Sequence, residues 1–359
     1  MNIAAYMYLI RGEEYKFPYQ ECVRSILPFC EGVHVLTDLR FSDTKSVTEK
    51  LKAISSKVIV HQEELELDNP GVDGISKARA RELASSSGAD WLLQMDADEI
   101  FRNCDIPKIK PLLLEAEEDI ISCGQINWFN GNHIKTDAPI SKERFSRNVK
   151  YITHGIPVQY RQERDDGLFY VEPDAPTDGA GYINMGGNSL SGGNTTPMDK
   201  AKIFISIGDT FKLFGKEHNL NIYVSNDFVT SLKNDIWVPH YSWYSIPHRW
   251  LREKTWHYFW GILRGKYENL QDYETADGKN IDFFVPSKLR TPRAYYEPIT
   301  NEMHSNKIAY CSWIEHPKAM DEWREKVTPY LYGKKKTILC KPRFSIMNLF
   351  TKSTQPIFD

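Results

Sequence analysis

Residues Trp91–Glu99 have the sequence WLLQMDADE, in which a nearly continuous apolar run ends in a cluster of carboxylates. The run Trp91–Met95 is typical of a central parallel strand, because helices cover such a strand on both faces. Asp96, Asp98 and Glu99 then place three carboxylates within four residues, where their charges repel one another unless a cation lies nearby. All-oxygen ligands of this kind suit Mg²⁺ or Mn²⁺, and the alternative interpretation is a solvated acidic turn at a helix start.

Strand-like and helix-like segments alternate through the first 125 residues. The expected strands are Ile3–Leu9, Val33–Thr37, Val58–His61 and Trp91–Met95, and the expected helices are Tyr19–Phe29, Thr44–Ile54 and Ser76–Ser87. This alternation predicts βαβ units and a doubly wound sheet. Ligands of such sheets bind at the carboxyl ends of the strands, so we expect Asp38 and Asp96, which each follow a strand, to face that crevice.

The pattern is less regular in the rest of the chain. Ile120–Phe129 and Trp237–Tyr244 resemble strands, and Asn184–Thr196 is expected to be a loop because of its glycines. The expected helices of this part are Met198–Lys216, Pro247–Leu263 and Pro317–Val327.

Composition and charge limit the classes of function. The chain has 359 residues, of which 41% are hydrophobic and 26% charged, which is enough for a sizeable core and argues against global disorder. The net charge of −3 combines an acidic first 125 residues with a basic tail, and the body between them is neutral, which disfavours a nucleic-acid binder. No apolar run reaches the roughly 20 residues of a membrane span. The six cysteines lack Cys-x-x-Cys spacing, so a cytoplasmic location is expected.

Several motifs in order resemble the family-2 glycosyltransferases of the GT-A fold. Asp96-Ala97-Asp98-Glu99 resembles their Asp-x-Asp motif, Tyr8–Glu14 their first strand and its turn, and Cys22–Pro28 the helix that follows. Asp38 and Asp43 resemble the pair of aspartates after the second strand, although the glycines common in that turn are absent and Gly12 replaces an asparagine. Ile75–Ala84 resembles the helix before the Asp-x-Asp strand.

This resemblance implies a GT-A type, Rossmann-like fold with a doubly wound mixed sheet, and the roles of individual residues. Asp98 would bind Mn²⁺ or Mg²⁺. The donor, a nucleoside diphosphate sugar with UDP favoured, would be contacted by Arg11, Glu13, Asp38, Lys77, Arg81 and Asp96. The implied enzyme is a hexosyltransferase that moves the sugar to a hydroxyl of a glycan or similar acceptor, with inversion.

The resemblance also suggests a division of the chain. Residues 1–125 would form the nucleotide-sugar-binding half, and 126–245 the acceptor-binding half of the same domain. Residues 246–332 would form a C-terminal helical extension rich in aromatic residues, and 333–359 a basic tail. The apolar and cationic residues of the tail would suit contact with a membrane surface or a partner, and the alternative is an ordinary frayed terminus.

His240 is the expected further metal ligand, because it ends an apolar strand-like segment and some metal-dependent GT-A enzymes use a late histidine. The alternative for a lone histidine among aromatic residues is packing in the core. Nearby, Trp243 and Tyr244 are candidates for stacking on a sugar, whereas Trp256 and Trp260 share one helix face and are interpreted as core.

An inverting transfer needs a carboxylate that accepts the proton of the acceptor hydroxyl. We select Asp178, which lies in a glycine-flanked turn; the other candidates are Asp165, Asp166, Glu172 and Asp174. An ordinary Asp-Gly turn is the alternative interpretation of Asp178.

Three other functions fit the sequence less well. A glycosyltransferase acting on modified DNA bases is disfavoured by the neutral body of the chain. A nucleotidyltransferase on a related α/β fold is disfavoured because no glycine-rich phosphate loop occurs near the first strand. A non-catalytic carbohydrate-binding protein is disfavoured by the intact pair Asp96 and Asp98.

Overall fold

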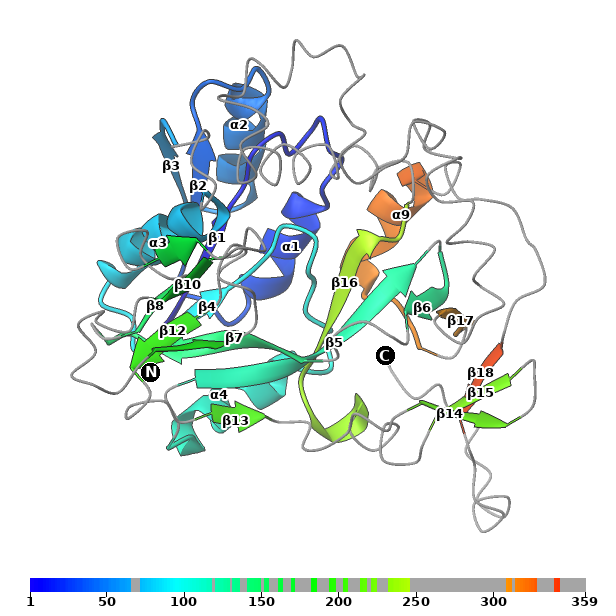
Figure 1. The fold of residues 1–359 in the computed structure, drawn as a ribbon. Helices are drawn as coiled ribbons and strands as arrows, with labels where there is room; N and C mark the ends of the chain where they lie inside the picture. Colours follow the sequence, from blue (N-terminus) through cyan, green and yellow to red (C-terminus); the bar gives the residue numbers. More distant parts are fainter. Residues whose placement is uncertain are drawn as a thin grey trace.

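The computed structural model has one large mixed sheet, flanked by helices (Figure 1). It describes residues 1–65, 72–117, 120–129, 131–135, 141–149, 152–154, 161–163, 169–171, 182–185, 194–197, 203–205, 214–217, 221–224, 232–245, 308–311, 314–327 and 339–342. In this part of the chain, thirteen strands form the main sheet. A two-stranded sheet consists of β9 (Arg161–Glu163) and β10 (Phe169–Val171), and a three-stranded sheet has the order β11 (Tyr182–Met185), β12 (Asn194–Pro197), β8 (Thr153–His154).

The N-terminal half forms the parallel part of the main sheet. Its strands lie in the order β4 (Trp91–Gln94), β1 (Ile3–Tyr8), β2 (Gly32–Asp38) and β3 (Val58–Glu63), and all neighbours are parallel. The connecting helices are α1 (Tyr19–Ile26), α2 (Thr44–Ile54) and α3 (Val72–Ser85), and α4 (Ile106–Glu115) follows β4. The elements expected in the first 100 residues are therefore all present.

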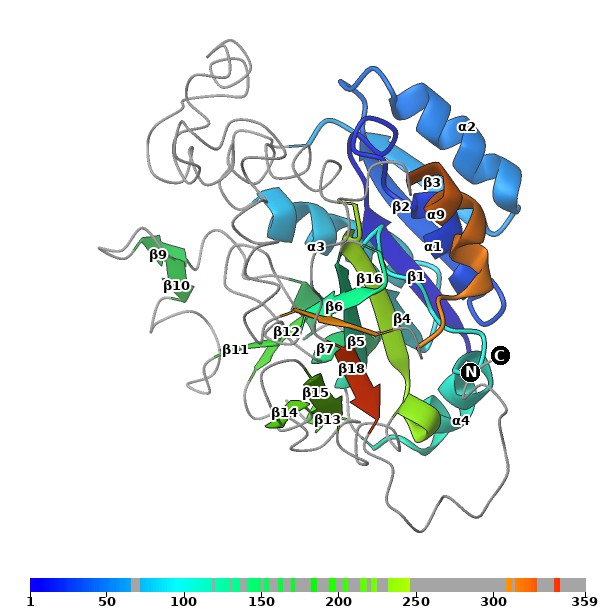
Figure 2. The same cartoon turned by 90° about the vertical axis from the view of Figure 1, so that its right-hand side faces the viewer.

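Alternate residues of β1 pack into two different cores, as expected of a sheet with helices on both faces. Ile3, Ala5 and Met7 belong to the larger core, with side chains of α1, α2 and α4. Ala4 and Tyr6 belong to a smaller core, with side chains of α3. Figure 2 shows α3 on one side of the parallel strands and α1 and α2 on the other. This arrangement confirms the α/β class and the doubly wound sheet.

The second half continues the sheet with antiparallel strands. β7 (Ser141–Arg147) is antiparallel to β4 on one side and to the long strand β5 (Ile120–Phe129) on the other. β16 (Trp237–Trp243) and β13 (Ile203–Ile205) are parallel to β5. The far edge is formed by β6 (His133–Lys135), β17 (Ile308–Tyr310), β18 (Leu339–Pro342), β15 (Asn221–Val224) and β14 (Phe214–Glu217).

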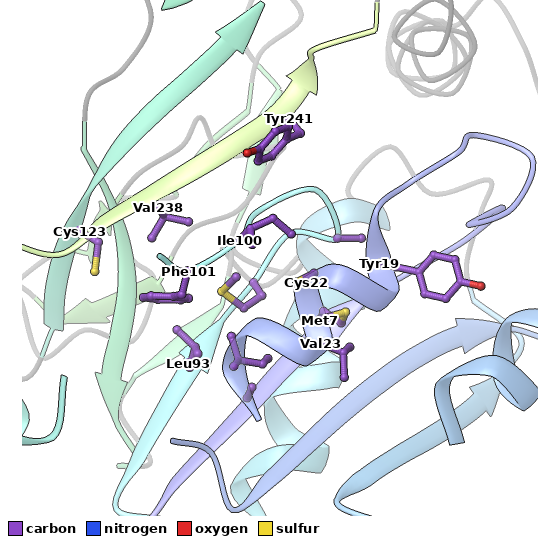
Figure 3. Close-up of a cluster of buried hydrophobic side chains, with 14 of the residues drawn as sticks. Met7, Tyr19, Cys22, Val23, Leu93, Ile100, Phe101, Cys123, Val238 and Tyr241 are labelled. Carbon is purple, nitrogen blue, oxygen red and sulfur yellow. The ribbon is translucent and has the colours of Figure 1, made fainter. Parts of the chain in front are cut away.

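β16 lies very close to β5 at one glycine. A Cβ atom added to Gly124 would lie 2.4 Å from Cδ2 of Trp237, so only glycine lets the buried Trp237 ring cover β5 at this position. Ile100 and Phe101, just after the acidic turn, pack in the same core, near Val238 of β16 and Cys22 of α1 (Figure 3). The core thus joins the acidic turn to a strand that lies about 140 residues later in the sequence.

Some expectations for the second half are wrong. The helix expected over Met198–Lys216 is replaced at Ile203–Ile205 and Phe214–Glu217 by the strands β13 and β14, because pairing with β5 and β15 outweighs a weak helical pattern. The ends of the expected loop Asn184–Thr196 pair as β11 and β12.

Two other expectations for the second half are confirmed. The strand expected over Trp237–Tyr244 is present as β16, and the helix expected over Pro317–Val327 is present as η7 (Lys318–Met320) and α9 (Asp321–Val327). Pro247–Leu263 and most of the expected helical extension lie outside the described residues. No described helix has the length and hydropathy needed to cross a bilayer.

Candidate functional site

The acidic turn after β4 is shaped by Glu99, whose side chain is fully buried. Its carboxylate accepts hydrogen bonds from the backbone N–H of Asp96, at 3.1 Å, and from the Gln125 amide, at 2.8 Å. The third partner is the buried guanidinium of Arg144, which also donates to Gln94. Glu99 therefore holds the turn in place from within the core, and its carboxylate is not available to a ligand.

β16 fixes the other side of the turn. The N–H of Tyr241 donates to the carbonyl of Asp98 at 2.8 Å, and the N–H of Ile100 donates to the carbonyl of Pro239 at 3.0 Å. Through these backbone bonds, Glu99 and His240 form an antiparallel bridge. The strand expected to carry a metal ligand is thus hydrogen-bonded directly to the Asp-x-Asp turn.

This pairing brings Asp98 and His240 together. Nε2 of His240 lies 3.5 Å from Oδ1 of Asp98, and both side chains are mostly buried, with 17% and 6% of their surface exposed. Nδ1 of His240 lies 2.8 Å from Oδ1 of Asn127 on β5. A carboxylate oxygen and an imidazole nitrogen that face each other are suitable ligands for Mn²⁺ or a similar divalent cation.

The donor set at this position fits a metal as part of its coordination shell. Among the described residues, His, Cys, Asp and Glu form no group of three or more that could hold an ion without further ligands. Asp98 and His240 would supply two ligands, and substrate phosphates and water complete such shells in enzymes that act on nucleotides.

Asp96 is surrounded by basic side chains. Its carboxylate lies 2.8 Å from Nζ of Lys142, 3.1 Å from Nζ of Lys77 and 3.4 Å from a guanidinium nitrogen of Arg144. Burial alone would raise the pKa of Asp96, but these three cations hold it well below its ordinary value. Asp96 is therefore ionised, and Lys77, expected to contact the diphosphate or base, is paired with it.

Sequence reasoning missed Lys142 and Arg144. They alternate along β7, so both point to the face of the sheet that carries Asp96. Their only signal in the sequence is the spacing of Lys142 and Arg144, two residues apart in a short strand-like segment, SKERFSR.

Arg81 has a structural role. Its guanidinium donates to Oγ of Ser146 at 2.6 Å and to the carbonyls of Arg147 and Ile152 at 3.0 and 3.1 Å, so it joins α3 to β7 and the residues after it. Because Arg81 is only 4% exposed, its charge lies below the surface expected to contact a nucleotide.

Asp38 is fully buried at the end of β2. Its carboxylate accepts hydrogen bonds from the backbone and side chain of Arg40, at 2.6–3.0 Å, and from the N–H of Leu65 at 2.8 Å. Burial would raise the pKa of Asp38, but these donors outweigh it and lower the pKa. Asp38 thus ties the β2 turn to the segment after β3.

The loop after β1 carries Arg11 and Glu13. Arg11 adopts a positive φ of 51°, and its guanidinium lies 4.6 Å from the centroid of the Phe41 ring. The Glu13 carboxylate accepts hydrogen bonds from Tyr19 and from Lys50. Asp43 accepts hydrogen bonds from the backbone N–H groups of Glu13, at 2.9 Å, and Glu14. Both predicted nucleotide residues therefore lie on a loop held by the β2–α2 turn.

The remaining predicted residues divide into two groups. Tyr244 is buried in an aromatic cluster with Tyr241, Trp323 and the half-buried His316, where partial burial lowers the pKa of His316 to about 2. Tyr244 therefore packs in the core and does not present its ring to a sugar, whereas Trp243 stacks on Phe129 with ring centroids 6.2 Å apart. The candidate base Asp178, its alternatives, Trp256, Trp260 and the basic tail beyond Pro342 lie outside the described residues.

Comparison with known proteins gives weak similarities. No family model matches the chain, and no curated protein matches it. Among solved structures, S. aureus TarS is 16% identical over 41% of this chain and 28% of its own length, with a TM-score of 0.30. A structure of TarS residues 1–349 is 12% identical over 85% of this chain and 89% of its own, with a TM-score of 0.29. GalNAc-T7, solved with UDP, GalNAc and Mn²⁺, is 12% identical over 85% of this chain and 58% of its own, with a TM-score of 0.29. At TM-scores of 0.29–0.30, these similarities assign no function to this chain.

Proposed function

We propose that this chain is a metal-dependent glycosyltransferase of the GT-A fold, which moves a sugar from a nucleoside diphosphate sugar to a hydroxyl acceptor with inversion. One observation carries the proposal: Asp98 and His240, about 140 residues apart, converge at 3.5 Å beyond the carboxyl end of β4. The carboxyl ends of parallel strands are where doubly wound sheets bind their ligands. A carboxylate and an imidazole are groups that bind divalent cations, and an ordinary acidic turn needs no histidine beside it.

The charges around the turn suit a diphosphate only when a metal is bound. Asp96, Asp98 and Glu99 are balanced by Lys77, Lys142 and Arg144, so the protein groups alone sum to about zero. A divalent cation at Asp98 and His240 adds a net positive charge beside Lys77 and Lys142. An anionic diphosphate is attracted to that charge, and we expect donor binding to require the metal.

Each residue then has a defined task. Asp98 and His240 hold Mn²⁺ or Mg²⁺, which when bound stabilises the charge that grows on the leaving diphosphate. Glu99 and Arg144 hold the turn, and Asp96 with its lysines lies beside the phosphates. Arg11 and Glu13 line the base and ribose end, where the buried Asp38 holds the turn after β2, within a donor-binding half formed by residues 1–125. UDP is the favoured nucleotide.

The acceptor side of the reaction lies in the second half of the chain. Residues 126–245 bind the acceptor, a glycan or a similar hydroxyl compound, and Asp178 takes the proton of its hydroxyl as the sugar is transferred. The basic tail, 333–359, is outside the reaction and contacts a partner or an anionic membrane surface.

Donor binding tests the proposal directly. Thermal shifts with UDP-, GDP-, CMP- and dTDP-sugars should show stabilisation by one of these donors with Mn²⁺ and none with EDTA. Asp98→Asn keeps the size of the side chain but removes its charge, and it should abolish the metal-dependent shift and the transfer. Asp321→Asn, on the exposed start of α9, is the matched control and should behave as the wild type. Metal-independent donor binding, or normal transfer by Asp98→Asn, would refute the metal site.

A further inference from the structure

The imidazole of His240 has a buried hydrogen-bond partner, Asn127, on the neighbouring strand β5. Asn127 lies directly opposite His240 in the parallel pairing of β5 with β16, and only 6% of it is exposed. Its Oδ1 lies 2.8 Å from Nδ1 of His240. The two side chains therefore meet on one face of the sheet, and Asn127 contacts Nδ1 of the ring whereas Asp98 faces Nε2.

The chemistry of this contact fixes the proton on the ring. An amide oxygen only accepts hydrogen bonds, so Nδ1 of His240 must carry the proton and donate it to Asn127. A neutral imidazole has a single N–H, and Nε2 then presents a lone pair. In that neutral tautomer, Nε2 would present its lone pair to Oδ1 of Asp98, which lies 3.5 Å away, and a carboxylate oxygen is also an acceptor. Two acceptors that face each other are stabilised by a cation between them.

The backbone hydrogen bonds beside His240 position its main chain but not its imidazole ring. The bonds from Tyr241 N–H to Asp98 and from Ile100 N–H to Pro239 fix the chain on both sides of His240. They do not fix the rotation of the imidazole or its tautomer. Asn127 is the described residue that does both, because its hydrogen bond is aligned with one ring nitrogen only.

We propose that Asn127 is a positioning residue, which locks His240 in the Nδ1–H tautomer and so commits Nε2 to the cation shared with Asp98. This inference rests on the proposed metal site, but the tautomer itself can be observed without any metal. Partners of this kind typically change metal affinity about 10–100-fold when they are lost.

The first measurement uses the wild-type protein without metal. Labelling with ¹⁵N-histidine and long-range ¹⁵N–¹H correlation show which ring nitrogen carries the proton, and His240→Gln identifies the signals of His240 among the ten histidines. We expect a protonated Nδ1 and a bare Nε2. A protonated Nε2 would overturn the inference, whatever the variants do.

The second measurement is the affinity for Mn²⁺, from the electron paramagnetic resonance of free Mn²⁺ with UDP present. Asn127→Leu removes the acceptor at similar size and should give mixed tautomers and weaken Mn²⁺ binding about 10–100-fold. Asn127→Asp keeps an acceptor and should retain the tautomer and bind Mn²⁺ within a few-fold of wild type.

The chain offers a matched control in Asn132, whose Oδ1 lies 3.0 Å from Nε2 of His316 in the aromatic cluster. Asn132→Leu removes the same kind of bond away from the carboxylates, so it should lower stability and leave Mn²⁺ affinity unchanged. If His240→Gln weakens Mn²⁺ binding but Asn127→Leu does not, the positioning role is refuted and the metal site stands. If neither variant changes Mn²⁺ affinity, the metal assignment of His240 fails as well.

Discussion

Replacing Arg144 should destabilise the protein far more than replacing an exposed arginine. The guanidinium is 1% exposed and pairs with the fully buried Glu99, the Gln94 amide and Asp96. Removing one partner of a buried ion pair leaves the other charge uncompensated and costs about 3–5 kcal/mol. Glu99 keeps the Gln125 amide and the N–H of Asp96, so we expect Arg144→Met to cost about 3 kcal/mol, the lower end of that range.

The assay is urea unfolding followed by tryptophan fluorescence. Arg79→Met is the matched control, because Arg79 pairs with Glu63 and Glu82 on the surface with 41% of its side chain exposed. Exposed pairs of this kind contribute about 0–1 kcal/mol. The double variant Glu99→Gln/Arg144→Met removes both charges and should cost less than the sum of the single changes, by about 0.5–3 kcal/mol.

Two results would contradict this reasoning. One is an unfolding free energy for Arg144→Met that is no lower than for Arg79→Met, which would mean that Glu99 does not need its partner. The other is strict additivity in the double variant, which would mean that Arg144 and Glu99 stabilise the fold independently.

Three further predictions follow from the site and from the sequence. Asp38 has a folded-state pKa below the unfolded value of about 3.9, so its charge stabilises the fold above that pH, and this stabilisation is lost as the pH falls through the folded pKa. The urea midpoint of the wild type should therefore fall more steeply between about pH 5 and pH 2 than that of Asp38→Asn, and parallel curves for the two proteins would contradict this. Asp178→Asn should leave donor affinity unchanged and slow transfer about 10²–10⁴-fold, and normal transfer alongside a defect in Glu172→Gln or Asp174→Asn would move the role of base to that residue. A chain ending at residue 332 should retain transfer and lose co-sedimentation with anionic liposomes, and equal binding by both chains would exclude the tail as an anchor.

The parallel half of the fold could be predicted because its signals are local. Each strand and helix of residues 1–100 has its own hydrophobic pattern, and the βαβ order then decides which strands are neighbours. The same logic predicted that Asp38 and Asp96 lie at the carboxyl ends of the parallel strands. In the second half the strands are short and paired with distant partners, so Met198–Lys216 was predicted as a helix although Ile203–Ile205 pairs with β5.

Of the candidate site, the sequence indicated the two proposed metal ligands, Asp98 and His240. The structure places their side chains 3.5 Å apart, and the metal itself stays a prediction. Lys142 and Arg144 could not be predicted, because they reach Asp96 only through the antiparallel pairing of β7 with β4, which no local pattern indicates. The hydrogen bonds of Arg81 could not be predicted for a related reason, since its partners Ser146 and Ile152 lie 65 and 71 residues away.

The turn after β4 therefore depends on both halves of the chain. β7 supplies the cations that keep Asp96 ionised, and β16 supplies His240 and the backbone bonds that hold Asp98. Three carboxylates within four residues of an isolated β4 turn would repel one another, and they gain Lys142, Arg144 and His240 as neighbours only when β7 and β16 have paired with the sheet. The turn thus becomes a defined site only after the long-range contacts form. A substitution that weakens the docking of β16, such as Gly124→Ala against Trp237, should consequently lower Mn²⁺ affinity as well as stability, although it touches neither Asp98 nor His240.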